Sequence, residues 1–137
     1  MSLKIGVIGG GAIARACHIP GYAAVPECTL AAIADISQES LDAVREKWRF
    51  QHEYRDYREM LRREKPDLVS VCVPNKFHTD AAVAALESGA DVILEKPVST
   101  TLSGAEEIRK AVHRTGRRLA VGFSHRFNSM VRAGAEA

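Results

Sequence analysis

Glycines follow the first apolar run of the chain in a pattern that suits phosphate binding. Residues 9–14 read Gly-Gly-Gly-Ala-Ile-Ala and fit G-x-G-x-x-A, between a strand-like run, residues 4–9, and a helix-like segment. In this pattern Gly9 permits a tight turn, Gly11 leaves no Cβ in front of a diphosphate, and Ala14 lets the helix pack close to the strand. Amides at the start of the helix then face the phosphates, helped by the helix dipole. The predicted diphosphate-binding positions are Gly9, Gly11, Ala12, Ile13 and Ala14; a glycine-rich turn that binds no ligand is the alternative.

An acidic residue stands at the end of the second apolar run. Asp35 directly follows residues 29–34, where a carboxylate can accept hydrogen bonds from the adenosine ribose hydroxyls. The same carboxylate would repel the 2′-phosphate of NADP, and no Lys or Arg follows at once, because Ile36 and Ser37 come next. The sequence therefore predicts NAD as the cofactor, preferred over NADP. The alternative is that Asp35 merely caps the next helix, a role that Ser37 could also fill.

Further polar residues follow the third and fourth apolar runs, and ligands of open α/β sheets lie beyond such strand ends. Pro74 and Asn75 end the third run and His78 begins the next helix, so they are predicted to contact the nicotinamide ribose or the substrate. Asn75 and His78 serve equally well as a turn residue and a helix-start residue, and this reading stays open.

The fourth run ends in Glu95-Lys96-Pro97, which places a lysine where it can take part in catalysis. Partial burial beside a positively charged nicotinamide ring would lower the pKa of Lys96. It could then orient a substrate hydroxyl or share its proton, and Glu95 could pair with it or bind ribose. A surface lysine before a proline is the alternative, and whether the bond to Pro97 is cis is open.

Alternating apolar and amphipathic segments predict the fold that positions these residues. The strand-like runs are nearly continuous in apolar residues, as expected for parallel strands covered on both faces, and lie at residues 4–9, 29–34, 68–73, 92–94 and 119–123. Helices are predicted between them at residues 13–24, bent or ended by Pro20, and at residues 37–48, 57–64, 78–87 and 102–115. We predict an α/β, doubly wound, mostly parallel Rossmann sheet with helices on both faces, with residues 51–54 as a short edge strand.

Composition narrows the class of protein. The chain has 137 residues and a net charge of +2, which fits one domain and gives no electrostatic case for nucleic acid. Its three cysteines form no C-x-x-C pair, so neither a disulfide framework nor a metal site is expected, and reduced thiols indicate the cytoplasm. No apolar run approaches the length of a membrane span, and no leader peptide is visible.

Taken together, these motifs resemble the N-terminal domain of the glucose–fructose oxidoreductase/inositol dehydrogenase/MocA family. The residues that carry the resemblance are the glycine pattern at 9–14, Asp35, the segment 74–78, the triplet 95–97 and the segment 122–128. The resemblance implies hydride transfer between NAD(P) and a hydroxyl or carbonyl carbon, commonly of a sugar or cyclitol. It also implies that Lys96 is the catalytic lysine, that His78 lies near the nicotinamide, and that Arg126 approaches the cofactor.

The chain departs from that family's pattern in its length. Family members continue into a substrate domain with a D-x-x-x-H pair, whereas nothing follows Ala137 here, and Ser129 stands where the family often has proline. We therefore predict a dinucleotide-binding domain over residues 1–123 and the start of a connection over residues 124–137. Such a chain is expected to bind the cofactor without full catalysis, and to be monomeric although full-length members usually self-associate. An NAD-binding sensor or assembly module is the alternative, and an S-adenosylmethionine site is a weaker one.

Overall fold

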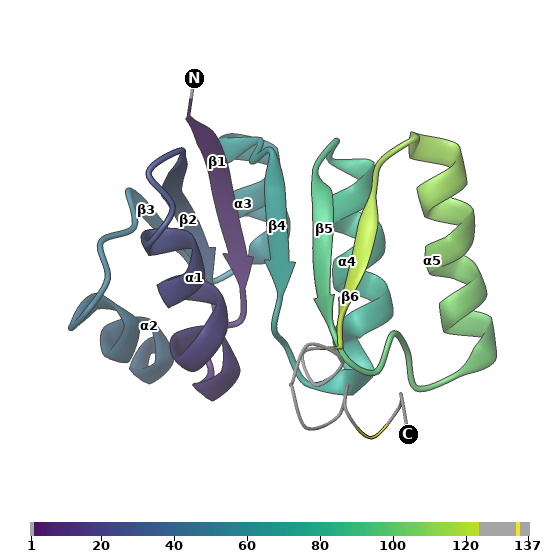
Figure 1. The fold of residues 1–137 in the computed structure, drawn as a ribbon, viewed down its shortest axis with the longest axis horizontal. Helices are drawn as coiled ribbons and strands as arrows, with labels where there is room; N and C mark the ends of the chain where they lie inside the picture. Colours follow the sequence, from purple (N-terminus) through teal and green to yellow (C-terminus); the bar gives the residue numbers. More distant parts are fainter. Residues whose placement is uncertain (1, 124–133, 135–137) are drawn as a thin grey trace.

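The computed structural model describes residues 2–123 and residue 134 as one parallel β-sheet flanked by helices (Figure 1). The strands are β1 (Leu3–Ile8), β2 (Cys28–Ala34), β3 (His52–Tyr54), β4 (Leu68–Val71), β5 (Asp91–Glu95) and β6 (Leu119–Gly122). The helices are α1 (Ile19–Ala23), α2 (Gln38–Arg45), α3 (Tyr57–Glu64), α4 (His78–Glu87) and α5 (Leu102–Thr115), with a π-helical turn η1 (Ala14–His18) and a 3₁₀ turn η2 (Asn75–Phe77). None of the helices in this described part of the chain is long and apolar enough to cross a bilayer.

The strand order is β3-β2-β1-β4-β5-β6, and every neighbouring pair is parallel. The chain runs outward from β1 to the edge strand β3, then crosses back to place β4 on the other side of β1. This reversal between β1 and β4 is the topological switch point at which doubly wound sheets bind ligands. The predicted fold class is confirmed, and the short segment predicted as an edge strand is β3.

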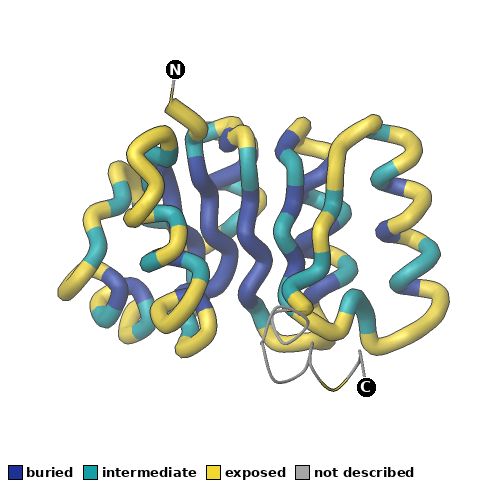
Figure 2. Tube along the Cα trace, viewed as in Figure 1, coloured by how far each residue is buried: buried dark blue, intermediate teal, exposed yellow. Residues whose placement is uncertain are grey.

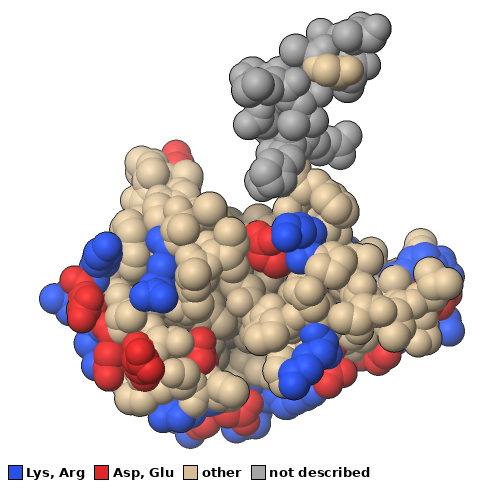
Figure 3. Space-filling view, turned by 90° about the horizontal axis from the view of Figure 1, so that it is seen from below, with Lys and Arg blue, Asp and Glu red and all other residues tan. Residues whose placement is uncertain are grey.

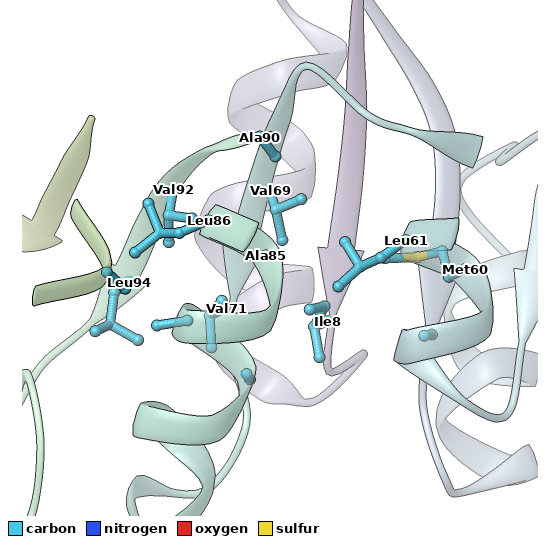
Figure 4. Close-up of a cluster of buried hydrophobic side chains, with 14 of the residues drawn as sticks. Ile8, Met60, Leu61, Val69, Val71, Ala85, Leu86, Ala90, Val92 and Leu94 are labelled. Atoms are coloured by element: carbon cyan, nitrogen blue, oxygen red, sulfur yellow. The ribbon is translucent and has the colours of Figure 1, made fainter. Parts of the chain in front are cut away.

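The helices cover the two faces of the sheet and bury its central strands (Figures 1 and 2). Helices α1 and α2 pack on one face with a cluster that includes Ile5, Ala14 and Val44. Helices α3, α4 and α5 pack on the other face over a larger cluster, part of which Figure 4 shows. Each fully buried Leu, Ile or Val side chain stabilises the fold by roughly 1.5–3 kcal/mol. Because helices cover β1 and β4 on both faces of the sheet, these strands are nearly continuous in apolar residues, as their sequences show.

Short polar side chains begin three of the helices. Ser37 accepts a hydrogen bond from the amide of Ser40 at the start of α2, Asp56 caps α3, and Thr101 caps α5. Ser37 is thus the N-cap of α2, which leaves Asp35 free of that role. Gly116 ends α5 in the left-handed conformation, which glycine adopts readily.

The first helix differs from its prediction at Pro20. It does not end or break there: the π-turn η1 runs from Ala14 to His18, and α1 continues directly from Ile19. The amide of Ile19 donates to the carbonyl of Ala14, five residues back. Pro20 has no N–H to donate to the preceding turn, and the wider hydrogen bonding of η1 lies directly before it. The change of helix type therefore accommodates the proline.

Candidate functional site

A cavity of about 610 Å³ opens at the carboxyl edge of the sheet, at the switch point. Figure 3 looks onto this edge, and its charged side chains gather mainly towards the periphery. Four of the predicted site residues line the cavity: Gly9, Gly11, Asp35 and Pro74. The sheet order explains their meeting, because β1, β2 and β4 are adjacent and parallel and so bring their ends together.

Two glycines of the loop after β1 are needed for different reasons. Gly9 has φ +95°, and a Cβ there would lie 2.6 Å from the carbonyl oxygen of Cys72, so both backbone and packing require glycine. A Cβ built on Gly11 would meet no atom within 4 Å. The fold itself has no need of glycine at position 11, and open space lies in front of it. This is the arrangement that a diphosphate would fill.

The rest of the glycine motif forms the start of the helix. Ala14 is fully buried in the cluster under α1 and α2, as close helix–strand packing requires. Ala12 is exposed, and the Ile13 side chain is 41% exposed. Neither lines the cavity, so their predicted part in binding rests on backbone amides rather than on side chains.

The Asp35 carboxylate is held against the glycine loop. One of its oxygens accepts a hydrogen bond from the amide of Gly10 at 2.7 Å, and the other accepts one from the amide of Ser37 at 2.8 Å. Both oxygens keep a further lone pair. The carboxylate thus lies beside the predicted diphosphate site with acceptor capacity to spare for ribose hydroxyls.

A residue that the sequence analysis overlooked, Arg55, also lines the cavity. It follows β3, and its guanidinium donates to the carbonyl of Ile36 and, at 3.4 Å, to Gln38 Oε1. The prediction of NAD over NADP rested on the positions that directly follow Asp35, and Ile36 and Ser37 are not basic. Because β3 lies parallel and next to β2, the residues after β3 lie at the same carboxyl edge of the sheet as Asp35. The edge strand predicted at residues 51–54 could therefore have pointed to Arg55.

His78 is the first residue of α4, as the reading of it as a helix-start residue expected, and its ring is buried. The side chain is 1% exposed, with Nδ1 2.7 Å from the Pro97 carbonyl oxygen and Nε2 2.9 Å from that of Val73. Both ring nitrogens face backbone carbonyl oxygens, and the contact with a cofactor stays a prediction. His78 joins the turn after β4 to the turn after β5. Asn75 is exposed at the start of η2, outside the cavity lining.

The Glu95-Lys96-Pro97 turn differs in part from its prediction. The Lys96 side chain is exposed, and the bond between Lys96 and Pro97 is cis. Glu95 pairs with His18 rather than with the lysine ammonium: its Oε1 lies 2.7 Å from His18 Nε2. The sequence offered no signal for His18, which lies one residue before α1. The last predicted residue, Arg126, lies outside the described residues.

Cys72 stands in the cavity wall with an unreactive thiol. Its side chain is almost wholly buried, and this burial, reinforced by the charge of Glu95, raises the pKa of Cys72 to about 12. We expect a thiol reagent at neutral to mildly alkaline pH to modify the exposed Cys17 quickly and Cys72 roughly 100-fold more slowly. Mass spectrometry of peptides from a labelling time course measures both rates. Rapid labelling of Cys72 in a Cys17→Ser variant would contradict the assignment.

Comparison with known proteins identifies the family. The model of the glucose–fructose oxidoreductase/inositol dehydrogenase/MocA proteins, described as "Oxidoreductase family, NAD-binding Rossmann fold", matches residues 3–123. The chain belongs to this family. D-glucoside 3-dehydrogenase of Escherichia coli is 36% identical over 125 residues, which are 91% of this chain and 36% of that protein. Inositol 2-dehydrogenase of Salmonella typhimurium is 29% identical over 131 residues, 93% of this chain and 39% of that protein.

Solved structures agree with the fold. The WlbA dehydrogenase of Bordetella pertussis, in complex with NADH and UDP-GlcNAcA, matches with a TM-score of 0.92 and 25% identity, over 100% of this chain and 42% of that one. Scyllo-inositol dehydrogenase of Lactobacillus casei, with bound NAD(H) and scyllo-inositol, matches with a TM-score of 0.89 and 22% identity, over 99% and 40%. The chain thus spans well under half the length of these relatives.

Proposed function

We propose that this chain is the cofactor-binding part of an NAD-dependent dehydrogenase that acts on a CH–OH group of a sugar or cyclitol. The observation that carries the proposal is the open space in front of Gly11, flanked by the Asp35 carboxylate in one cavity. The family and the printed activities of its relatives, a glucoside dehydrogenase and an inositol dehydrogenase, support the reaction and substrate class. Lys96 directly follows β5 at the same edge of the sheet, where its exposed side chain is accessible to a substrate.

The chain's own residues divide the work of binding and chemistry. Amides of the glycine loop, from Gly11 to Ile13, would bind the diphosphate, and Asp35 would accept hydrogen bonds from the adenosine ribose. The preference for NAD over NADP follows from the negative charge of Asp35. NAD supplies the hydride acceptor when it is bound. The Lys96 ammonium would hold the substrate hydroxyl and take part in moving its proton.

Titration calorimetry of the chain with NAD, NADP and S-adenosylmethionine tests the proposal. We expect binding of NAD, weaker binding of NADP because Asp35 repels the 2′-phosphate, and none of S-adenosylmethionine. With NAD and a panel of inositols and glucosides, we expect the 137-residue chain alone to produce little NADH, since a half-open site does not exclude water. Tighter binding of S-adenosylmethionine than of NAD would overturn the cofactor assignment, and robust NADH formation would overturn the expected inactivity.

The remaining expectations are proposals of the same kind. We propose a dinucleotide-binding domain over residues 1–123, followed by a connection over residues 124–137, with a polyol or sugar as the small-molecule partner of the whole enzyme. Three cysteines without a C-x-x-C pair support a reducing compartment, which would be the cytoplasm.

A further inference from the structure

Four polar side chains form a chain of hydrogen bonds on the α1 face of the sheet. The Tyr22 hydroxyl lies 2.5 Å from Ser70 Oγ, and Ser70 Oγ lies 3.0 Å from His18 Nδ1. His18 Nε2 in turn lies 2.7 Å from Glu95 Oε1. Ser70 is fully buried and the His18 side chain is 9% exposed, so these hydrogen bonds are largely shielded from solvent. It connects the first helix to the ends of β4 and β5.

The π-turn η1 brings His18 into this chain. Its wider hydrogen-bond spacing, from the Ile19 amide to the Ala14 carbonyl, inserts one residue into the helix. Within the turn Cys17 is exposed, whereas His18 is directed at Ser70 on the sheet. Such single-turn π segments occur frequently at functional sites. Here the segment starts at the end of the glycine motif, so one helix carries both features.

The donors and acceptors match along the whole chain. A carboxylate only accepts, so His18 Nε2–H donates to Glu95. In the neutral ring His18 Nδ1 then accepts from Ser70, whose oxygen accepts from Tyr22. Glu95 is confined further by β6, since a Cβ at Gly122 would lie 3.1 Å from Glu95 Oε1. Its second oxygen lies 3.3 Å from the backbone amide of Lys96 and keeps acceptor capacity.

Glu95 lies on the opposite half of the sheet from Asp35. Doubly wound sheets bind the two halves of a dinucleotide on either side of the switch point. Asp35 directly follows β2 in the half that would hold the adenosine, and Glu95 is the last residue of β5 in the other half. The two carboxylates therefore stand in corresponding positions, each restrained by neighbours on other elements.

We propose that His18 is a positioning residue: the chain Tyr22–Ser70–His18–Glu95 holds the Glu95 carboxylate in place to accept hydrogen bonds from the nicotinamide ribose. This inference rests on the proposed function. Its consequence is selective. Loss of His18 should weaken the binding of NAD and ADP-ribose, which contain the second ribose. It should leave the binding of ADP, which lacks that ribose, unchanged.

Calorimetry of the 137-residue chain with NAD, ADP-ribose and ADP tests the inference. We expect His18→Ala to lower the affinities for NAD and ADP-ribose about tenfold and to change the affinity for ADP less than twofold. His18→Gln, which keeps a donor that can reach Glu95, should recover part of the loss. Tyr22→Phe removes only the distant hydroxyl, preserves the packing of α1, and should give a smaller loss in the same direction. The matched control is His113→Ala, an exposed histidine on α5, which should leave all three affinities unchanged.

A double-mutant cycle identifies the route of the effect. Because His18 acts through Glu95, His18→Ala should have no further effect on ADP-ribose affinity in a Glu95→Gln background. Equal weakening of all three ligands, with a lower melting temperature, would show a purely structural role and overturn the inference. So would an unchanged ADP-ribose affinity in His18→Ala. If the wild-type chain binds none of the three ligands, the proposed function fails and the inference with it, whereas the first two results leave the proposed function standing.

Discussion

Gly11→Ala is expected to fold as well as the wild type and to bind NAD at least about tenfold more weakly. Among the described residues, apart from the direct chain neighbours, no atom lies within 4 Å of the added methyl group, so the fold has no steric reason to change. The methyl group would occupy the space assigned to the diphosphate, and overpacking of one such group costs about 1–3 kcal/mol. Thermal unfolding followed by circular dichroism, together with calorimetry of NAD binding, measures the two effects separately.

The matched control is Gly21→Ala in α1. A Cβ at Gly21 also meets nothing within 4 Å, but Gly21 does not line the cavity. This variant should keep its NAD affinity, and its melting temperature should stay the same or rise slightly because alanine favours helix. If Gly11→Ala bound NAD as tightly as Gly21→Ala does, the diphosphate would have to lie elsewhere.

Asp35→Asn is expected to weaken NAD binding about tenfold or more and to shift the preference towards NADP. Hydrogen bonds to a charged group are worth roughly 1.5–3 kcal/mol, and the substitution removes the charge without changing the size of the side chain. The amide oxygen can still accept from one of the two backbone donors, Gly10 or Ser37, so the loop should persist. Once the repulsion is lost, Arg55 is a positively charged residue of the cavity lining that can attract a 2′-phosphate.

Affinities for NAD and NADP, measured at one ionic strength, give the result as a ratio. Asp42→Asn makes the same chemical change on the exposed side of α2, where Asp42 pairs with Arg45, and it should leave the ratio unchanged. A parallel loss of NAD and NADP affinity in Asp35→Asn would argue that Asp35 supports the loop only and does not select between the cofactors.

The parts of this fold that depend on local pattern could be predicted from the sequence. Buried parallel strands need apolar residues on both faces, so β1 and β4 stand out as apolar runs, and helix ends follow from residues such as Ser37 and Gly116. The glycine motif and Asp35 could be placed at one edge because both directly follow strands. Their common cavity then follows from the strand order.

The parts that depend on partners from other elements could not be predicted. Nothing local marks the π-turn that directs His18 at the sheet, and its partners Ser70 and Glu95 lie 52 and 77 residues away in sequence. The place of His78 after a strand allowed either a ligand-binding or a helix-start role. Nothing local indicated that its ring would face two backbone carbonyl groups. Arg55 was overlooked because the edge strand before it lies beside β2 only in space.

The double contact of His78 has a mechanical consequence. One small ring ties the segment that forms a wall of the cavity to the turn that carries the lysine, through the carbonyl groups of Val73 and Pro97. A ligand that displaces one of these segments would therefore also disturb the contact of the ring with the other.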